Sequence, residues 1–176
     1  QELDHIKTGL LVPLLSLLFV GVLMVMAINP PLGRFNAWLS IQLDGMQGGS
    51  RLVLGTLLGG MMATDYGGPI NKAAYVSGTL ALVDLQYDLM AAVMAGGMIP
   101  PLGIGLACLL FPTRFTSTER CSAPQTLLMG ATFVTEGALP FALRDPLRVS
   151  LACIAGSALA GFITILLGCG CPAPHG

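Results

Sequence analysis

Long uncharged runs dominate the hydrophobic pattern of this chain. The runs 10–28, 89–111 and 149–167 each come close to or exceed the roughly 20 residues that a helix needs to cross a bilayer. The first run leads into Asn29, Pro30 and Pro31, which we expect to end its helix because proline removes a backbone donor. The pattern therefore predicts three membrane-spanning helices.

Two shorter apolar pieces, 52–64 and 73–83, flank a polar stretch that is rich in glycine and proline. Neither piece is long enough to cross a membrane alone. We interpret about 52–83 as one broken helix that crosses the membrane once. Such breaks are tolerated at membrane depth only where they line a cavity or are buried in protein.

The segment 121–143 is also too short to cross and return as two full spans. It carries Glu136 and Pro140 in its second half and is followed by a charged stretch that begins at Arg144. We predict a re-entrant hairpin over about 121–143, with Glu136 near its tip.

Composition narrows the class of protein. Hydrophobic residues make up 54% of the 176 residues and charged residues only 10%, whereas soluble domains carry about 25% charged residues. A soluble enzyme is therefore excluded. The net charge of −1, without a basic cluster, argues against nucleic-acid binding. The sequence predicts an all-α, polytopic membrane protein embedded in a lipid bilayer, with 1–176 as a single domain.

The arginines are distributed unevenly along this topology. With a broken crossing and a hairpin, six arginines fall on one side, and the other side holds Asp84, Asp88 and Lys7. The six are Arg34, Arg51, Arg114, Arg120, Arg144 and Arg148. Positive residues prefer the cytoplasmic side, so we expect all six to be cytoplasmic.

Two polar groups interrupt the apolar pattern and are the candidate binding residues. The first contains Asp65, Asn71 and Lys72, and the second contains Thr135 and Glu136. Charged residues at membrane depth are costly unless paired or solvated, and their donors and acceptors suit sugar hydroxyls or a phosphate. The structural alternatives are an ion pair between Asp65 and Lys72 or a position at the membrane interface for the first group, and an interfacial turn at Glu136 for the second. No nucleotide loop, zinc motif or nucleophile elbow is present, so we expect no catalytic residue, no metal and no cofactor.

These groups lie within two longer motifs. Residues 59–75 read G-G-M-M-A-T-D-Y-G-G-P-I-N-K-A-A-Y, and residues 135–142 read T-E-G-A-L-P-F-A, with D-P-L-R at 145–148. The chain resembles the membrane-embedded sugar permease, the IIC component, of the bacterial phosphoenolpyruvate-dependent phosphotransferase system, fructose branch. The Pro174-His175-Gly176 end is similar to a further element of that family. The chain resembles the C-terminal half of such a permease, without its N-terminal half and at least one later helix.

The resemblance implies a function. Such a permease takes up fructose or a similar sugar through the bacterial inner membrane as a multi-pass protein, and a phosphocysteine of the partner IIB domain phosphorylates the sugar. IIB and IIA would be partners, and the permease would be a homodimer. By resemblance, Glu136 is the first candidate sugar ligand and His175 the second. Asn71, Lys72 and Thr135 follow, with Asp65 as an orienting group.

Two other functions remain open from the sequence. One is a secondary transporter or channel that needs no phosphoryl donor. The other is a permease remnant that cannot enclose a pathway. The motifs do not identify the sugar.

Overall fold

The computed structural model describes residues 11–44 and 50–175, although several side chains between 28 and 44 lie outside that description. The described residues form helices and no strand. In chain order the elements are α2 (Val12–Leu23), the π-helical turn η2 (Met24–Ile28), α3 (Asn29–Asp44), α4 (Ser50–Met62), α5 (Pro69–Val83), α6 (Tyr87–Leu110), the 3-10 turn η3 (Pro112–Arg114), α7 (Ser117–Ala131), the 3-10 turn η4 (Thr135–Ala138), α8 (Leu139–Arg144) and α9 (Pro146–Leu166). Within these described ranges, three stretches are long and apolar enough to cross a membrane: Val12–Pro31, Tyr87–Leu110 and Pro146–Leu166. The prediction of an all-α, polytopic membrane protein is confirmed.

The chain divides into two compact units, 1–39 and 40–176. In the first unit the helix does not end at Pro30 and Pro31, so that expectation was wrong. The reason is the π-helical turn η2, in which the Asn29 N–H donates to the carbonyl of Met24, five residues back. In this wider turn a hydrogen bond spans five residues instead of four. The turn lies directly before the two prolines, which would otherwise disrupt the hydrogen-bond pattern of an α-helix.

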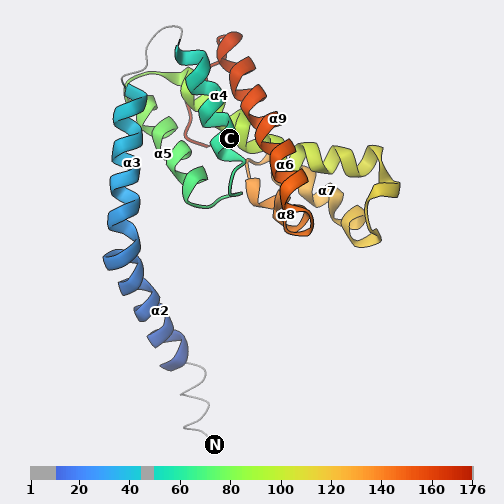
Figure 1. Cartoon of the computed structure of the whole chain (residues 1–176), viewed down its shortest axis with the longest axis horizontal. Helices are drawn as coiled ribbons and strands as arrows, with labels where there is room; N and C mark the ends of the chain where they lie inside the picture. The colour runs from blue at the N-terminus through green and yellow to red at the C-terminus, as the bar shows by residue number, and fades with distance from the viewer. Residues whose placement is uncertain (1–10, 45–49, 176) are drawn as a thin grey trace, which may run out of the picture. The chain divides into compact units, whose positions relative to one another are not determined.

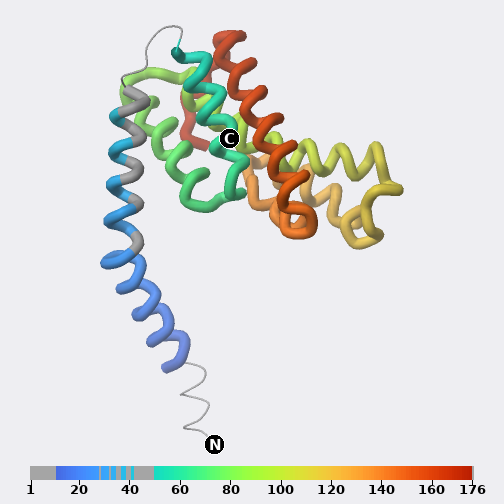
Figure 2. Tube along the Cα trace, in the orientation of Figure 1, coloured from blue at the N-terminus to red at the C-terminus, as the bar shows by residue number. Residues whose placement is uncertain are grey.

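In the second unit the predicted break between the two short helices is confirmed, because α4 ends at Met62 and α5 begins at Pro69. The two helices do not continue in one direction, however. Arg51 at the start of α4 forms an ion pair of 3.3 Å with Asp88, which lies just after α5 in the first turn of α6. Figure 2 shows the chain turning back between α4 and α5. Segment 50–83, which we call hairpin 1, therefore enters and returns on the same side, and a single crossing is excluded.

The predicted re-entrant hairpin is confirmed in segment 117–144, which we call hairpin 2. Arg144 at its end forms an ion pair of 2.5 Å with Glu119 near its start. Burial alone would raise the pKa of the Glu119 carboxyl, but hydrogen bonds from Arg144 and Thr116 bring that pKa below its ordinary value. The hairpin begins before residue 121, because Thr116 and Glu119 form a capping box at the start of α7.

Helix α6 connects the bases of the two hairpins and contains Pro100 and Pro101. Each proline lacks an N–H, so the carbonyls of Gly96 and Gly97 lose their helical donors. Both carbonyls accept a hydroxyl from elsewhere in the fold. Ser157 of α9 donates to Gly96 at 2.8 Å, and Thr135 of η4 donates to Gly97 at 3.0 Å. The proline pair thus ties α6 to α9 and to the tip of hairpin 2.

Helices α4 and α9 lie side by side in Figure 1 and meet through glycines. A Cβ added at Gly161 would lie 2.1 Å from the carbonyl oxygen of Gly55, and one added at Gly59 would lie 2.4 Å from that of Ser157. Backbones approach this closely only where side chains are very small. Helices α4 and α9 are therefore in direct backbone contact.

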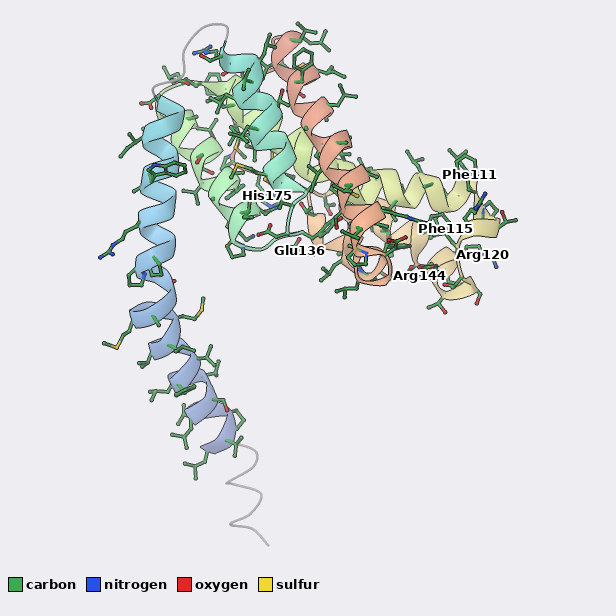
Figure 3. The ribbon with its side chains drawn as sticks, in the orientation of Figure 1. Phe111, Phe115, Arg120, Glu136, Arg144 and His175 are labelled. Carbon is green, nitrogen blue, oxygen red and sulfur yellow. The ribbon has the colours of Figure 1, made fainter. Side chains whose placement is uncertain are left out.

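Four arginines gather at the base of hairpin 2, on η3, α7, α8 and α9: Arg114, Arg120, Arg144 and Arg148. Figure 3 labels two of them, Arg120 and Arg144, at this end of the second unit. Arg51 lies instead at the base of hairpin 1 beside Asp88, at the other end of α6. Its assignment to the same side as these four was therefore wrong, because hairpin 1 folds back on itself.

The fold-back of hairpin 1 predicts a labelling pattern. Single cysteines at positions 116 and 146, in the intact permease without native cysteines, should react with a membrane-impermeant reagent from one side. Cysteines at positions 50 and 84 should both react from the opposite side, because both lie at the base of hairpin 1. Labelling of positions 50 and 84 from different sides would restore the single broken crossing.

Because α4 and α9 are in such close contact, one methyl group added at Gly161 should destabilise the protein. Gly161→Ala should lower the folded yield and the thermal stability of the intact permease, since overpacking costs about 1–3 kcal/mol. Gly103→Ala in α6 is the matched control, because no described atom lies within 4 Å of the added Cβ. Equal yields of monodisperse protein from both variants would contradict the packing.

Candidate functional site

The tips of the two hairpins border one cavity of about 530 Å3. Its lining comes from the end of α4, the first turns of α5, the turn before η4, η4 itself and the C-terminal segment. These residues are Met62, Asn71, Lys72, Tyr75, Phe133, Val134, Thr135, Glu136 and His175. Five of the six candidate residues from the sequence therefore lie at one place, and Asp65 lies beside it.

The tip of hairpin 1 is a tight turn built around Asp65. Its carboxylate accepts the backbone N–H groups of Ile70 at 2.7 Å and Asn71 at 3.0 Å, so it caps the start of α5. Gly67 in this turn has φ +102°, and a Cβ there would lie 2.3 Å from Oε1 of Glu136. Only glycine allows this approach, which brings the tips of the two hairpins together.

Asn71 and Lys72 follow on the first turn of α5. The Asn71 side chain is 4% exposed, and its amide donates to the carbonyl of Met62 at 2.6 Å, at the end of α4. Asp65 and Lys72 take no part in the ion pairs of the described residues. An ion pair between them was one explanation for these charges, and the structure contradicts it. The side chain of Lys72 borders the cavity instead.

The tip of hairpin 2 presents Thr135 and Glu136. Thr135 is 3% exposed, and its hydroxyl donates to the Gly97 carbonyl that Pro101 leaves without a helical donor. The next side chain, that of Glu136, borders the cavity, and the residue as a whole is exposed. Thr135 therefore anchors the tip, whereas Glu136 is the carboxylate that a ligand in the cavity can reach.

His175 reaches the cavity from the opposite end of the sequence. The segment after α9 returns along the second unit, where the N–H of Cys171 donates to the carbonyl of Tyr87 at 2.9 Å. The hydroxyl of Tyr75 donates to the carbonyl of Pro174 at 2.8 Å. Figure 3 shows His175 and Glu136 in the same central region. These long-range bonds hold the imidazole at the cavity.

Four lining residues, Met62, Tyr75, Phe133 and Val134, were missed by sequence reasoning, and two of them are aromatic. Tyr75 lies four residues after Asn71 on α5 and therefore shares its helix face, which was a usable signal. Phe133 contacts Tyr75 with ring centroids 6.2 Å apart and His175 with centroids 5.8 Å apart. No spacing rule links these three rings, because they come from three separate elements.

The cavity joins acceptors and donors of hydrogen bonds to an aromatic surface. Such a combination suits a small polar molecule with apolar faces, and about 300–1,000 Å3 is the usual size of small-molecule sites. Among the described residues, no group of three or more His, Cys, Asp or Glu side chains is arranged to hold a metal ion.

Thr135 provides a test of how the tip is anchored. Thr135→Val keeps the side-chain shape and leaves the Gly97 carbonyl without its donor, which costs about 1–3 kcal/mol for a buried group. The thermal unfolding temperature of the intact permease should fall. Thr135→Ser keeps the hydroxyl and is the control, so equal unfolding temperatures for the two variants would show that this bond does not anchor the tip.

The known proteins that are similar to this chain have names that agree with one another. The chain is 49% identical over 176 residues to the PTS system fructose-specific EIIB'BC component of Xanthomonas campestris, covering all of this chain and 30% of that protein. It is 47% identical over 177 residues to the fructose permease IIC component of Bacillus amyloliquefaciens, covering all of this chain and 58% of that protein. It is 41% identical over 168 residues to the fructose-specific EIIC component of Haloferax volcanii, covering 95% of this chain and 45% of that protein.

No protein-family model matches the chain, and no solved structure matches it. The chain spans less than two thirds of the length of the curated relatives named above. The resemblance found in the sequence motifs is nevertheless confirmed over the full chain. Over its whole length this chain is homologous to fructose-specific components of the phosphotransferase system, among them a fructose permease IIC component, and it aligns with only a part of each.

Proposed function

We propose that this chain carries the sugar site of a fructose-type phosphotransferase permease. Fructose or a similar sugar binds in the cavity between the hairpin tips, crosses the membrane, and receives a phosphoryl group from a IIB partner. The observation that carries the proposal is the cavity itself, since two separate hairpins and the C-terminal segment all bring polar side chains to it. The names of the relatives support the sugar and the phosphotransferase class.

Glu136 is the leading sugar ligand in this proposal. Its carboxylate lies at the tip of a hairpin, next to Gly67 of the other tip, and it borders the cavity. A carboxylate accepts hydroxyl hydrogen bonds that are stronger than those between neutral groups. His175, Asn71 and Lys72 supply further donors around the same space. Thr135 and Asp65 act indirectly, because their oxygen atoms hold the two tips in place.

The chemistry belongs to a partner. A phosphocysteine of a IIB domain gives its phosphoryl group to a sugar hydroxyl: an oxygen–phosphorus bond forms, the sulfur–phosphorus bond breaks, and the cysteine leaves as a thiolate while the hydroxyl proton is released. Relatives whose names combine B and C components, or A, B and C components, in one chain support IIB and IIA as partners. The IIB partner would reach the sugar from the cytoplasm, on the side that holds Arg114, Arg120, Arg144 and Arg148.

The same proposal includes the membrane location and the oligomeric state of the protein. The protein is a multi-pass component of the bacterial inner membrane, and two copies form the assembly. The three membrane-length helices support the membrane location. Phosphoenolpyruvate-dependent uptake by the intact permease distinguishes this function from that of a secondary transporter, a channel or a remnant without transport.

The sharpest test of the site is Glu136→Gln in the intact permease. The amide keeps the shape and loses the charge, and loss of a charged hydrogen-bond partner costs about 1.5–3 kcal/mol. Equilibrium binding of fructose should weaken by about tenfold to a hundredfold. Phosphorylation by the IIB partner should fall with it, while the amount of folded protein stays the same.

Asp84→Asn is the matched control, because it removes one exposed carboxylate at the base of hairpin 1, outside the cavity. Its fructose affinity should equal that of the wild type. Unchanged affinity in folded Glu136→Gln protein would remove Glu136 from the site and leave Asn71 and Lys72 as the ligands to test.

A further inference from the structure

An aromatic residue occupies the turn after α7 at the place where helices usually end in glycine. The N–H of Phe133 donates to the carbonyl of Gly130 at 3.2 Å, and the N–H of Val134 donates to that of Met129 at 2.8 Å. This pair of bonds defines the Schellman ending of a helix, whose left-handed residue is most often glycine. Phe133 adopts φ +61° there, which is unfavourable for a bulky side chain.

The strained backbone directs the Phe133 ring into the cavity. The ring lies over α6 at Gly97, where a Cβ would come within 2.5 Å of Cε2. It also contacts the Tyr75 ring, tilted by 37°, and the His175 ring, edge-on at 88°. Unfavourable backbone angles persist only when the surrounding contacts hold them, and they gather at functional sites.

The cavity therefore has two kinds of lining. Polar groups come from Glu136, Lys72 and Asn71, while Phe133 and Tyr75 add aromatic surface. A cyclic sugar has matching parts, namely hydroxyls at its rim and a flat face of C–H groups. An open-chain polyol has the hydroxyls but no rigid face. A flat aromatic surface can distinguish these two ligands by shape.

We propose that Phe133 is a specificity-determining residue that selects the cyclic form of the sugar. Its ring provides the apolar surface against which the C–H face of the sugar packs, while Glu136 accepts the hydroxyls. This inference rests on the proposed function of the cavity. The strain at the end of α7 is kept because a glycine there would remove the ring from the site.

The test compares three forms of the intact permease: wild type, Phe133→Leu and Phe133→Tyr. Leucine fills the space without an aromatic face, and tyrosine keeps the ring. Phe133→Leu should bind fructose about two- to tenfold more weakly, as expected for loss of an aromatic contact, whereas Phe133→Tyr should keep the wild-type affinity. Affinity for mannitol, an open-chain probe, should change less than affinity for fructose in the leucine variant.

A purely structural role for Phe133 predicts a different result. Phe133→Leu would then bind fructose like wild type, or both probes would weaken by the same factor, and either result overturns the inference. Glu136→Gln measured in parallel separates the two proposals. Weak fructose binding by Glu136→Gln with unchanged binding by Phe133→Leu leaves the sugar site intact and removes only the role of Phe133. Absence of fructose binding by the wild type overturns both.

A spectroscopic measurement covers the case in which Phe133→Leu does not fold. 4-Fluorophenylalanine replaces Phe133 in the otherwise wild-type permease and reports on the ring through its 19F resonance. Saturating fructose should shift that resonance, and saturating mannitol should shift it less. A resonance that fructose leaves in place would show that the sugar does not contact the ring.

Discussion

Two backbone carbonyls hold the centre of this fold together. Pro100 and Pro101 deprive Gly96 and Gly97 of their helical donors, and a carbonyl without a donor at membrane depth costs several kcal/mol. Ser157 and Thr135 meet that need from two different elements. The two prolines in α6 are therefore matched by two hydrogen bonds, which join α6 to α9 and to the tip of hairpin 2.

At the tip of hairpin 1, side chains likewise pair with backbone groups that have no partner within their helix. Asn71 satisfies the terminal carbonyl of α4, and Asp65 satisfies two N–H groups of α5. Unpaired helix ends could not be buried in lipid, so the chain supplies a side chain for each of them. Asn71 and Thr135, which help to hold the two hairpins, therefore also border the cavity, and Asp65 lies next to it. Fold and site share one short stretch of sequence.

The sequence could predict the helices, both breaks and most of the candidate site, because apolar run length and buried charge carry those signals directly. It could not predict that hairpin 1 folds back. A Gly/Pro break between two short helices allows the second helix either to continue in the direction of the first or to reverse it. The pairing of Arg51 with Asp88 decides that point, and it depends on contacts between distant elements. Phe133 was missed for a related reason, because local preference favours glycine at its position.

The cap on α5 has a consequence for what leaves the cavity. A helix N-terminus ordinarily attracts phosphate through its exposed N–H groups and its dipole. Here the carboxylate of Asp65 already occupies the N–H groups of Ile70 and Asn71, and Glu136 lies against the same tip. An uncharged sugar loses nothing by this arrangement. Under the proposed function, a sugar that had gained a phosphate would find carboxylates at this tip instead of the free N–H groups that form a phosphate site.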